Sequence, residues 1–414
     1  MTPLKSAFRT IHLWLGLASG LVIVWVCLTG CVLAFEKELE QSWHSERYFV
    51  APAGTPRLAL AQVAEAVRAH KPKAKISGLK VYADPTRTVE VSLAGAPEGG
   101  KGGEGRRAGA EPEGGAKRVP GEGPGKDGKG GKGRGEGGGP RVFVNPYTAA
   151  ITGELNPRDN FFKTVEQLHR GLVAGKIGKL VTGISASMFL FILATGIVLW
   201  WPAARKAFSA RLKVKWGSGW KRLNHDFHIV LGFYASVFLF VIALTGVGMS
   251  FDWVGEGINR LTHSPTKRPE APESAAPAGA APFAADAVLA LARQQAPDAE
   301  SYALQLPKDA KGSIRVAVLR PGAITDNATD EVYLDQYSGQ VISGQTYAQR
   351  PVGQRIRGLF KPVHTGAIFG WPTKVLALLM TLLGATFPVT GTIMWLNRWR
   401  KQQRKRRPLE AVAS

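Results

Sequence analysis

Cysteine is nearly absent from this chain of 414 residues: the two cysteines, Cys27 and Cys31, lie four positions apart in an apolar stretch. This number and spacing exclude a disulfide framework, a cysteine-rich zinc site and the CxxCH motif of covalent cofactor attachment. Residues 28–31, LTGC, match a lipoprotein cleavage box, but the same Thr-Gly pair recurs three times with no cysteine after it. We therefore expect both thiols to pack in an apolar environment.

Acidic residues are scarce as well, with 31 Asp and Glu against 53 Lys and Arg and a net charge of +22. Such an excess can indicate a nucleic-acid-binding protein, but here the cations flank apolar runs. They gather before the first run, at 205–222 and in the tail at 397–414. These positions are alternate ends of successive runs and so lie on one side of a membrane, which the positive-inside rule identifies as the cytoplasm. We expect no nucleic-acid partner, although the tail could contact anionic lipid.

Charge is missing altogether from four apolar runs, at 13–35, 180–201, 229–251 and 375–396. About 20 helical residues cross a bilayer core of about 30 Å, and each run reaches that length. We expect four transmembrane helices with the lipid bilayer as partner, both termini in the cytoplasm and both long connections outside.

The four runs are of two kinds, and each kind occurs twice. In one kind a histidine precedes Thr-Gly by 17 residues, at His12 and His228; in the other it does so by 26 residues, at His169 and His364. The two kinds of run alternate along the chain, so each half of the chain contains one run of each kind. The chain is therefore a tandem duplication whose halves should be related by an axis along the membrane normal.

The two outer regions also match each other in order and type. In the first we expect a helix at 58–70, strands within 75–93, a disordered Gly-rich insert at 94–140, and strand, turn, strand at 141–155. In the second we expect a Pro/Ala-rich linker at 265–282, a helix at 284–295, a strand at 313–319, and strand, turn, strand at 331–342. The predicted fold class is a membrane all-α four-helix bundle, a tandem repeat of two helix pairs, with two α+β modules on the outer side.

The predicted organisation follows from these assignments. It comprises transmembrane helix 1 at 1–35; outer module 1 at 36–162, including the insert at 94–140; an outer interfacial segment and transmembrane helix 2 at 163–201; a cytoplasmic loop at 202–227; transmembrane helix 3 at 228–251; outer module 2 at 252–358; an outer interfacial segment and transmembrane helix 4 at 359–396; and a basic cytoplasmic tail at 397–414.

The four repeated histidines are the candidate functional residues, because ionisable groups at the ends of spans are costly. The topology places His12 and His228 at the inner interface, and His169 and His364 at the outer one. A twofold axis would bring each pair face to face, which fits bis-His ligation of a haem iron. We expect two haem b groups, one near each membrane face, with these four residues as cofactor and metal ligands. No catalytic residue is predicted.

Other residues near the spans receive simpler explanations. A histidine at a span end can also be a polar cap at the water boundary, but that does not explain four matched offsets. His225 has Arg9 at its repeat counterpart and should be solvated or lie behind the ligands. We expect His44, His70 and His263 at the surface and the tryptophans at span ends in interfacial belts. A flat macrocycle could approach the backbone at the glycines near the histidines, namely Gly16, Gly171, Gly232 and Gly366.

The motifs HxWLGLxxG…LTG, LHRxLxxGxxG…TGxxLWWP, NxDFHxxLGFY and HTGxxFG…TGxxMW resemble the PepSY-associated transmembrane proteins. This resemblance covers nearly the whole chain except the insert and the tail. It implies a multi-pass protein of the bacterial inner (plasma) membrane and outer modules of PepSY fold, a helix on a small antiparallel sheet. The family includes di-haem siderophore reductases, and its ligating histidines carry over to His12, His169, His228 and His364. The insert departs from the family pattern.

Our leading hypothesis is a di-haem b reductase that takes electrons from an unknown cytoplasmic or quinol donor. It would reduce a ferric siderophore or another iron chelate in the periplasm and so release iron. One alternative is a PepSY-based scaffold that binds peptides or regulates a protease without redox activity. A second is a permease subunit, since tandem repeats are common in transporters.

Overall fold

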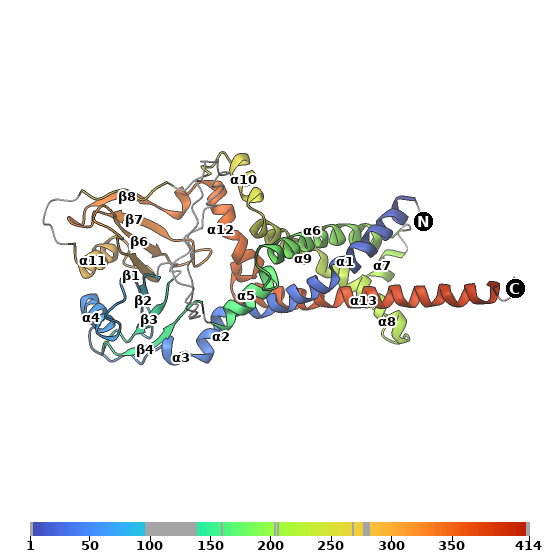
Figure 1. Cartoon of the computed structure of the whole chain (residues 1–414), viewed down its shortest axis with the longest axis horizontal. Coiled ribbons are helices and arrows are strands. Elements are labelled where there is room, and N and C mark those ends of the chain that lie inside the picture. Colours follow the sequence, from blue (N-terminus) through green and yellow to red (C-terminus); the bar gives the residue numbers. More distant parts are fainter. Residues whose placement is uncertain are drawn as a thin grey trace, which may run out of the picture.

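The computed structural model describes residues 3–95, 139–158, 160–202, 204, 207–266, 269–275 and 282–410, with backbone alone at 405–410. The insert predicted at 94–140 lies almost entirely outside these residues. The molecule is elongated, with a helical bundle at one end and a β-sheet at the other (Figure 1). Both termini lie at the end of the bundle that is remote from the sheet.

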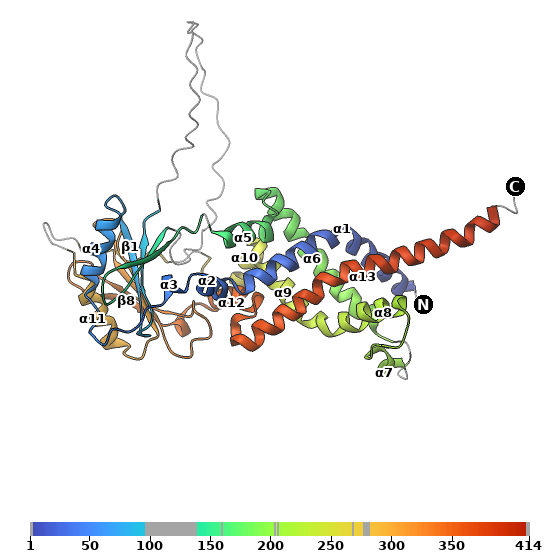
Figure 2. The same ribbon diagram turned by 90° about the horizontal axis from the view of Figure 1, so that it is seen from below.

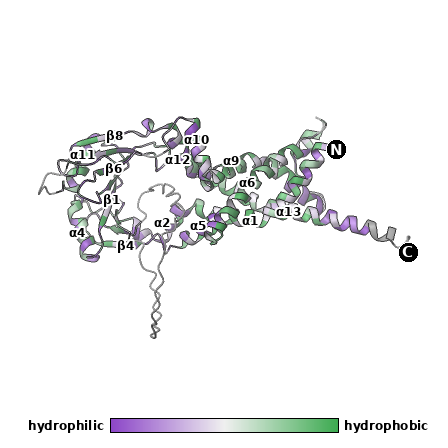
Figure 3. Ribbon diagram, turned by 45° about the horizontal axis from the view of Figure 1, so that its top comes forward, coloured by the Kyte–Doolittle hydropathy of each residue, from purple (hydrophilic) through white to green (hydrophobic). Residues whose placement is uncertain are grey.

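Within the described residues, four helices are long and apolar enough to cross a membrane. They are α1 (Pro3–Ala34), α6 (Gly175–Trp200), α9 (Gly232–Ser250) with its N-terminal extension, and α13 (Trp371–Glu410). The extension consists of α8 (Trp220–Asp226) and a π-helical turn, η2 (Phe227–Leu231). Apolar side chains fill the bundle interior around Leu239 and also cover its outside, where Leu21 is 84% exposed. A helix that is hydrophobic all round suits a lipid environment, and the bundle is hydrophobic along its length (Figure 3).

Two short helices precede the second and fourth spans. They are α5 (Phe161–Gly171) and α12 (Val352–His364), and each carries a repeated histidine in its last turn. The chain reverses after α5 through Leu172, Val173 and Gly175, which all have positive φ. A Cβ on Gly178 would lie 1.7 Å from the carbonyl oxygen of Gly171, so only glycine allows α5 and α6 to meet this closely. The reversal after α12 uses η4 (Ala367–Phe369), flanked by glycines of positive φ.

The strands of both outer modules form one antiparallel sheet in the order β4-β3-β2-β1-β5-β6-β7-β8. The central pair joins the halves, with Lys80 of β1 opposite Ala303 of β5. Pairing satisfies main-chain groups that would otherwise form two exposed sheet edges. The strands are β1 (Ile76–Tyr82), β2 (Val89–Leu93), β3 (Arg141–Val144), β4 (Ile151–Leu155), β5 (Ser301–Gln305), β6 (Ile314–Leu319), β7 (Asp330–Leu334) and β8 (Val341–Gln345).

Two helices, α4 (Leu60–His70) and α11 (Ala285–Gln295), cover the sheet face that points away from the bundle (Figure 2). Their apolar stripes and the strands share one core, in which Val63, Val91, Val288 and Val316 are at most 1% exposed. The opposite sheet face looks toward the bundle. The remaining short helices lie in the connections: α2 (Glu36–Trp43), α3 (Ser45–Tyr48), α7 (Phe208–Arg211), α10 (Asp252–Leu261) and η3 (Tyr347–Gln349).

Two histidine pairs and the cavity below the sheet

The fold brings the four repeated histidines together as two pairs. The ring centroids of His12 and His228 lie 6.4 Å apart, with an interplanar angle of 78°. Those of His169 and His364 lie 6.0 Å apart at 70°. The first pair connects α1 with the π-helical turn before α9, and the second connects the C-terminal turns of α5 and α12.

These separations can be compared with the geometry of a metal held between two imidazoles. A metal–nitrogen bond is about 2.0 Å and a ring nitrogen lies about 1.1 Å from its centroid, so the two centroids would be about 6.2 Å apart. The observed 6.4 and 6.0 Å bracket this value. No three His, Cys, Asp or Glu side chains converge as a metal site among the residues that the structure describes. A pair of imidazoles at this separation fits a metal that a prosthetic group already holds, as in haem.

Each histidine is hydrogen-bonded through Nδ1 to the threonine of a Thr-Gly pair on a neighbouring helix. Within each half the bonds are reciprocal, because the histidine of each span region contacts the threonine of the other. The Nδ1···Oγ1 distances are 3.0 Å for His12–Thr195, 3.1 Å for His169–Thr29, 2.8 Å for His228–Thr390 and 3.2 Å for His364–Thr245.

The threonines also fix which ring nitrogen carries the proton. Thr29 Oγ1 donates to the carbonyl of Trp25 in its own helix, so toward His169 it acts as an acceptor. The carbonyl of Val26 lies 3.0 Å from the same Nδ1 and is an acceptor only. Nδ1 of His169 therefore carries the hydrogen, which leaves the Nε2 lone pair available to a metal. The carbonyl of Ile242 acts in the same way on His364, at 2.8 Å.

The glycine of each Thr-Gly pair leaves room for the imidazole ring of the neighbouring histidine. A Cβ at Gly30 or Gly246 would lie 3.1 Å from Cε1 of the neighbouring imidazole, and at Gly391 or Gly196 it would lie 3.2 or 3.4 Å away. The sequence predicted that a macrocycle could approach glycines 16, 171, 232 and 366; a Cβ at these positions would meet groups other than the histidine rings, or open space. The recurrence of Thr-Gly in every span was the sequence signal for these contacts with the histidines.

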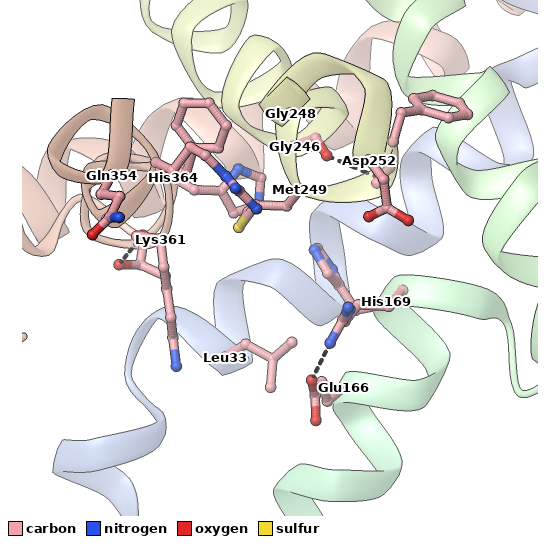
Figure 4. A pocket seen from close by; sticks show the side chains of 18 of the residues that line it. Leu33, Glu166, His169, Gly246, Gly248, Met249, Asp252, Gln354, Lys361 and His364 are labelled. Atoms are coloured by element: carbon pink, nitrogen blue, oxygen red, sulfur yellow. Dashed lines mark hydrogen bonds and ion pairs between the residues drawn. The ribbon is translucent and has the colours of Figure 1, made fainter. Parts of the chain in front are cut away.

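A cavity of about 1580 Å³ adjoins the outer pair. His169 and His364 line this cavity (Figure 4). Its wall also includes the sheet-proximal halves of α1, α6 and α9, and Arg315 and Tyr333 on the underside of the sheet. Small-molecule pockets usually measure about 300–1,000 Å³, so this space exceeds what one drug-sized ligand needs. Cys27, a buried free thiol, lies on its wall among apolar side chains.

Two carboxylates on the cavity wall differ in their pKa. Burial raises the pKa of Glu36, and the charge of Lys361 only partly offsets this effect. Burial also acts to raise the pKa of Glu166, but hydrogen bonds from Lys163 and Arg170 outweigh it and lower that pKa. Glu166 is thus a paired anion, while Glu36 is the carboxylate more easily protonated.

The underside of the sheet carries matched ion pairs of opposite polarity in the two modules. Glu90 of β2 accepts from Arg141 of β3 at 3.4 Å, and at the corresponding positions Arg315 of β6 donates to Glu331 of β7 at 2.7 Å. The strand registers confirm the correspondence, since Glu90 lies opposite Phe143 and Arg315 opposite Tyr333. The duplication has kept the pair and exchanged its charges.

The other histidines lie away from both pairs. The half-exposed His225 contacts Asp226 at 3.2 Å. His70 is exposed and contacts Glu154 at 2.7 Å, and His263 is also exposed. Trp200, at the end of α6, packs against protein: it is 4% exposed and stacks on Phe233 with ring centroids 3.6 Å apart.

Comparison with protein families gives a match over almost the full length of the chain. The PepSY-associated TM region matches residues 9–398. The chain belongs to this family. The match to the PepSY-associated family includes all four spans, both histidine pairs and the whole sheet. A comparison with curated proteins found no match.

Proposed function

We propose that this PepSY-associated membrane protein is a di-haem b electron-transfer protein that reduces ferric siderophores or similar iron chelates. The observation that carries the proposal is the pair geometry: two His–His pairs with centroids 6.0–6.4 Å apart, each Nδ1 bonded to a threonine. The polar-cap explanation accounts for a single histidine at an interface. It gives no reason for two pairs with this spacing and the same threonine partner.

Haem held by each histidine pair would supply one-electron transfer. The protein's own contribution is to hold the imidazoles in one tautomer, to exclude water with the apolar bundle, and to leave space at the Thr-Gly glycines. His12 and His228 would hold one group at the end near the termini. His169 and His364 would hold the other next to the cavity.

The distribution of cations supports an orientation. Lys5 and Arg9 lie at the end of the bundle remote from the sheet, together with the loop around Arg211 and the basic tail after Arg398. By the positive-inside rule this end faces the cytoplasm, and the sheet lies in the periplasm of a bacterial inner membrane. Electrons would then enter from a cytoplasmic or quinol donor and leave toward the cavity.

Iron release follows from simple coordination chemistry. Siderophores bind iron through hard oxygen ligands, and Fe(II), with its lower charge, binds these more weakly than Fe(III). A ferric chelate held in the cavity below the sheet would lie against the outer histidine pair, whose two residues line the same space. The protein would thus be an oxidoreductase acting on the iron of a periplasmic chelate.

The deciding experiment is the optical spectrum of the detergent-purified protein, oxidised and then reduced with dithionite, with the haem-to-protein ratio. We expect low-spin b-type bands and two haems per chain. A colourless protein purified from haem-replete cells would remove the electron-transfer proposal.

One observation favours the peptide-binding scaffold as a second candidate. Strand β8 is exposed over its whole length and ends the sheet, and such an edge can accept an added peptide strand. This function needs no haem. Peptide binding that is unchanged in a haem-free variant lacking both histidine pairs would support it.

A further inference from the structure

The two helices that carry the outer histidines, α5 and α12, present different side chains to the cavity. Arg357, Lys361 and His364 occupy positions i, i+4 and i+7 of α12, so they share one face of that helix. All three line the cavity. The face leads from the underside of the sheet to the outer histidine pair, and Figure 4 shows Lys361 and His364 on it.

The corresponding face of α5 has a different character. Counted back from His169 by the same offsets, its residues are Glu166 and Phe162. Phe162 is 1% exposed and stacks on Trp43, and Glu166 is paired with Lys163 and Arg170. Of these two matched faces, only that of α12 carries two cations.

These two cations lack the partners that neutralise other cations in the same region. Among the described residues neither Arg357 nor Lys361 makes an ion pair within 4 Å, although both side chains are exposed within the cavity. By contrast, Lys374 at the start of α13 is buried and bonded to Glu38 at 2.6 Å. Lys361 acts on the charge of Glu36, but burial outweighs this effect and raises the pKa of Glu36.

We propose that the Arg357–Lys361 face of α12 makes the cavity select anionic ferric chelates, those with carboxylate or catecholate ligands, over neutral or cationic hydroxamate complexes. This inference rests on the proposed function and names its substrate class. Guanidinium and ammonium groups form charge-assisted hydrogen bonds with anionic oxygens, and these bonds are stronger than those between neutral groups. Complexes without net negative charge gain less from these two cations.

The test uses Ga(III) chelates, because Ga(III) has the charge and nearly the size of Fe(III) but is not reduced. Binding of Ga(III)-citrate, an anion, and of neutral Ga(III)-ferrichrome to the full-length protein in nanodiscs is measured by equilibrium dialysis. We expect tighter binding of Ga(III)-citrate, by about tenfold, and a difference that shrinks with added salt. In the double variant Arg357→Gln/Lys361→Gln we expect citrate-complex affinity to fall about tenfold or more and ferrichrome-complex affinity to change less than about twofold.

The matched control is Arg355→Gln. Arg355 lies on the same helix, is exposed and packs against Tyr347 outside the cavity lining. The Arg355→Gln variant should bind both gallium complexes with the same affinity as the unmodified protein. Preference for the neutral complex, or an equal effect of Arg355→Gln and the double variant, would overturn the inference.

The haem-to-protein ratio of each variant distinguishes failure of this inference from failure of the proposed electron-transfer function. If the double variant loses haem and keeps its affinity for Ga(III)-citrate, the cations serve haem carboxylates and the inference is wrong. If no preparation binds haem but citrate selectivity follows the variants, the electron-transfer proposal fails and the selectivity stands.

Discussion

The hydrogen bond between Thr29 and His169 offers the sharpest test of how the bundle prepares its histidines. Thr29→Val keeps the size and branching of the side chain and removes the hydroxyl that lies 3.1 Å from Nδ1. The imidazole then keeps one acceptor, the carbonyl of Val26 at 3.0 Å. The imidazole of His169 should keep the same tautomer but be oriented less firmly.

The expected magnitude follows from the number of bonds that remain. Loss of an outer-shell partner of a metal-bound histidine typically lowers metal affinity by about 10- to 100-fold. Because the Val26 carbonyl stays, we expect the lower end, about tenfold or about 1.4 kcal/mol at the outer pair. The inner pair, whose threonines are Thr195 and Thr390, should be unaffected.

The assay is transfer of haem to excess apomyoglobin, followed optically, with the potentials of the two haems measured by redox titration. Thr29→Val should release one of its two haems about tenfold more readily and shift one potential only. The matched control is Thr10→Val on the same helix. The Thr10 hydroxyl also bonds a helix carbonyl, that of Ser6 at 3.2 Å, but contacts no histidine. Equal behaviour of the two variants would refute the role assigned to the threonine.

Three further predictions address the ligands, the sheet and its pH dependence. His364→Ala should leave one haem per chain and stop reduction of ferric chelates; full activity in this variant would contradict the proposed route. Glu331→Gln removes a buried negative charge that forms ion pairs with both Arg315 and Arg350. Because loss of one partner of a buried ion pair costs about 3 kcal/mol, the melting temperature of this variant should fall. The control Glu300→Gln changes an exposed residue and should leave the melting temperature unchanged. Asp335 accepts backbone hydrogen bonds in the β7–β8 turn, and these lower the pKa of its carboxyl group in the folded protein. The ionised carboxylate therefore stabilises the fold above about pH 4, and this contribution is lost as the pH falls through the pKa of the folded state. Asp335→Asn should remove this acid-dependent loss from melting curves recorded between pH 6 and 3; an unchanged acid profile would count against the assignment.

The bundle could be predicted because its determinants are local in the sequence. Runs without charge define the spans, and the offset from histidine to Thr-Gly defines the repeat. The amphipathic spacing of Val63 and Val67 likewise predicted the helix that the structure shows as α4. These features depend on one segment at a time, and a single chain displays them directly.

Long-range pairing could not be predicted in the same way. Strand β5 is short, and its partner β1 lies more than 200 residues away, so no local pattern indicates that the two modules share one sheet. The reciprocal Thr–His bonds also join different helices, and only the recurrence of Thr-Gly hinted at them. The π-helical turn at Phe227–Leu231 carries His228 and interrupts a segment that reads as continuous helix. Such turns often occur at functional sites.

The two halves of the molecule agree where the proposed cofactors would be held and differ where a substrate would enter. Both histidine pairs have the same threonine and glycine environment. Away from them, α12 presents Arg357 and Lys361 where α5 presents Phe162 and Glu166. Lys374 of the second half forms an ion pair with Glu38 of the first half. The repeat counterparts of these two residues are Lys179 and Val254, which cannot form such a pair. Lys179 lines the cavity. The asymmetry is what we expect if electrons pass between equivalent sites toward a single acceptor held on one side.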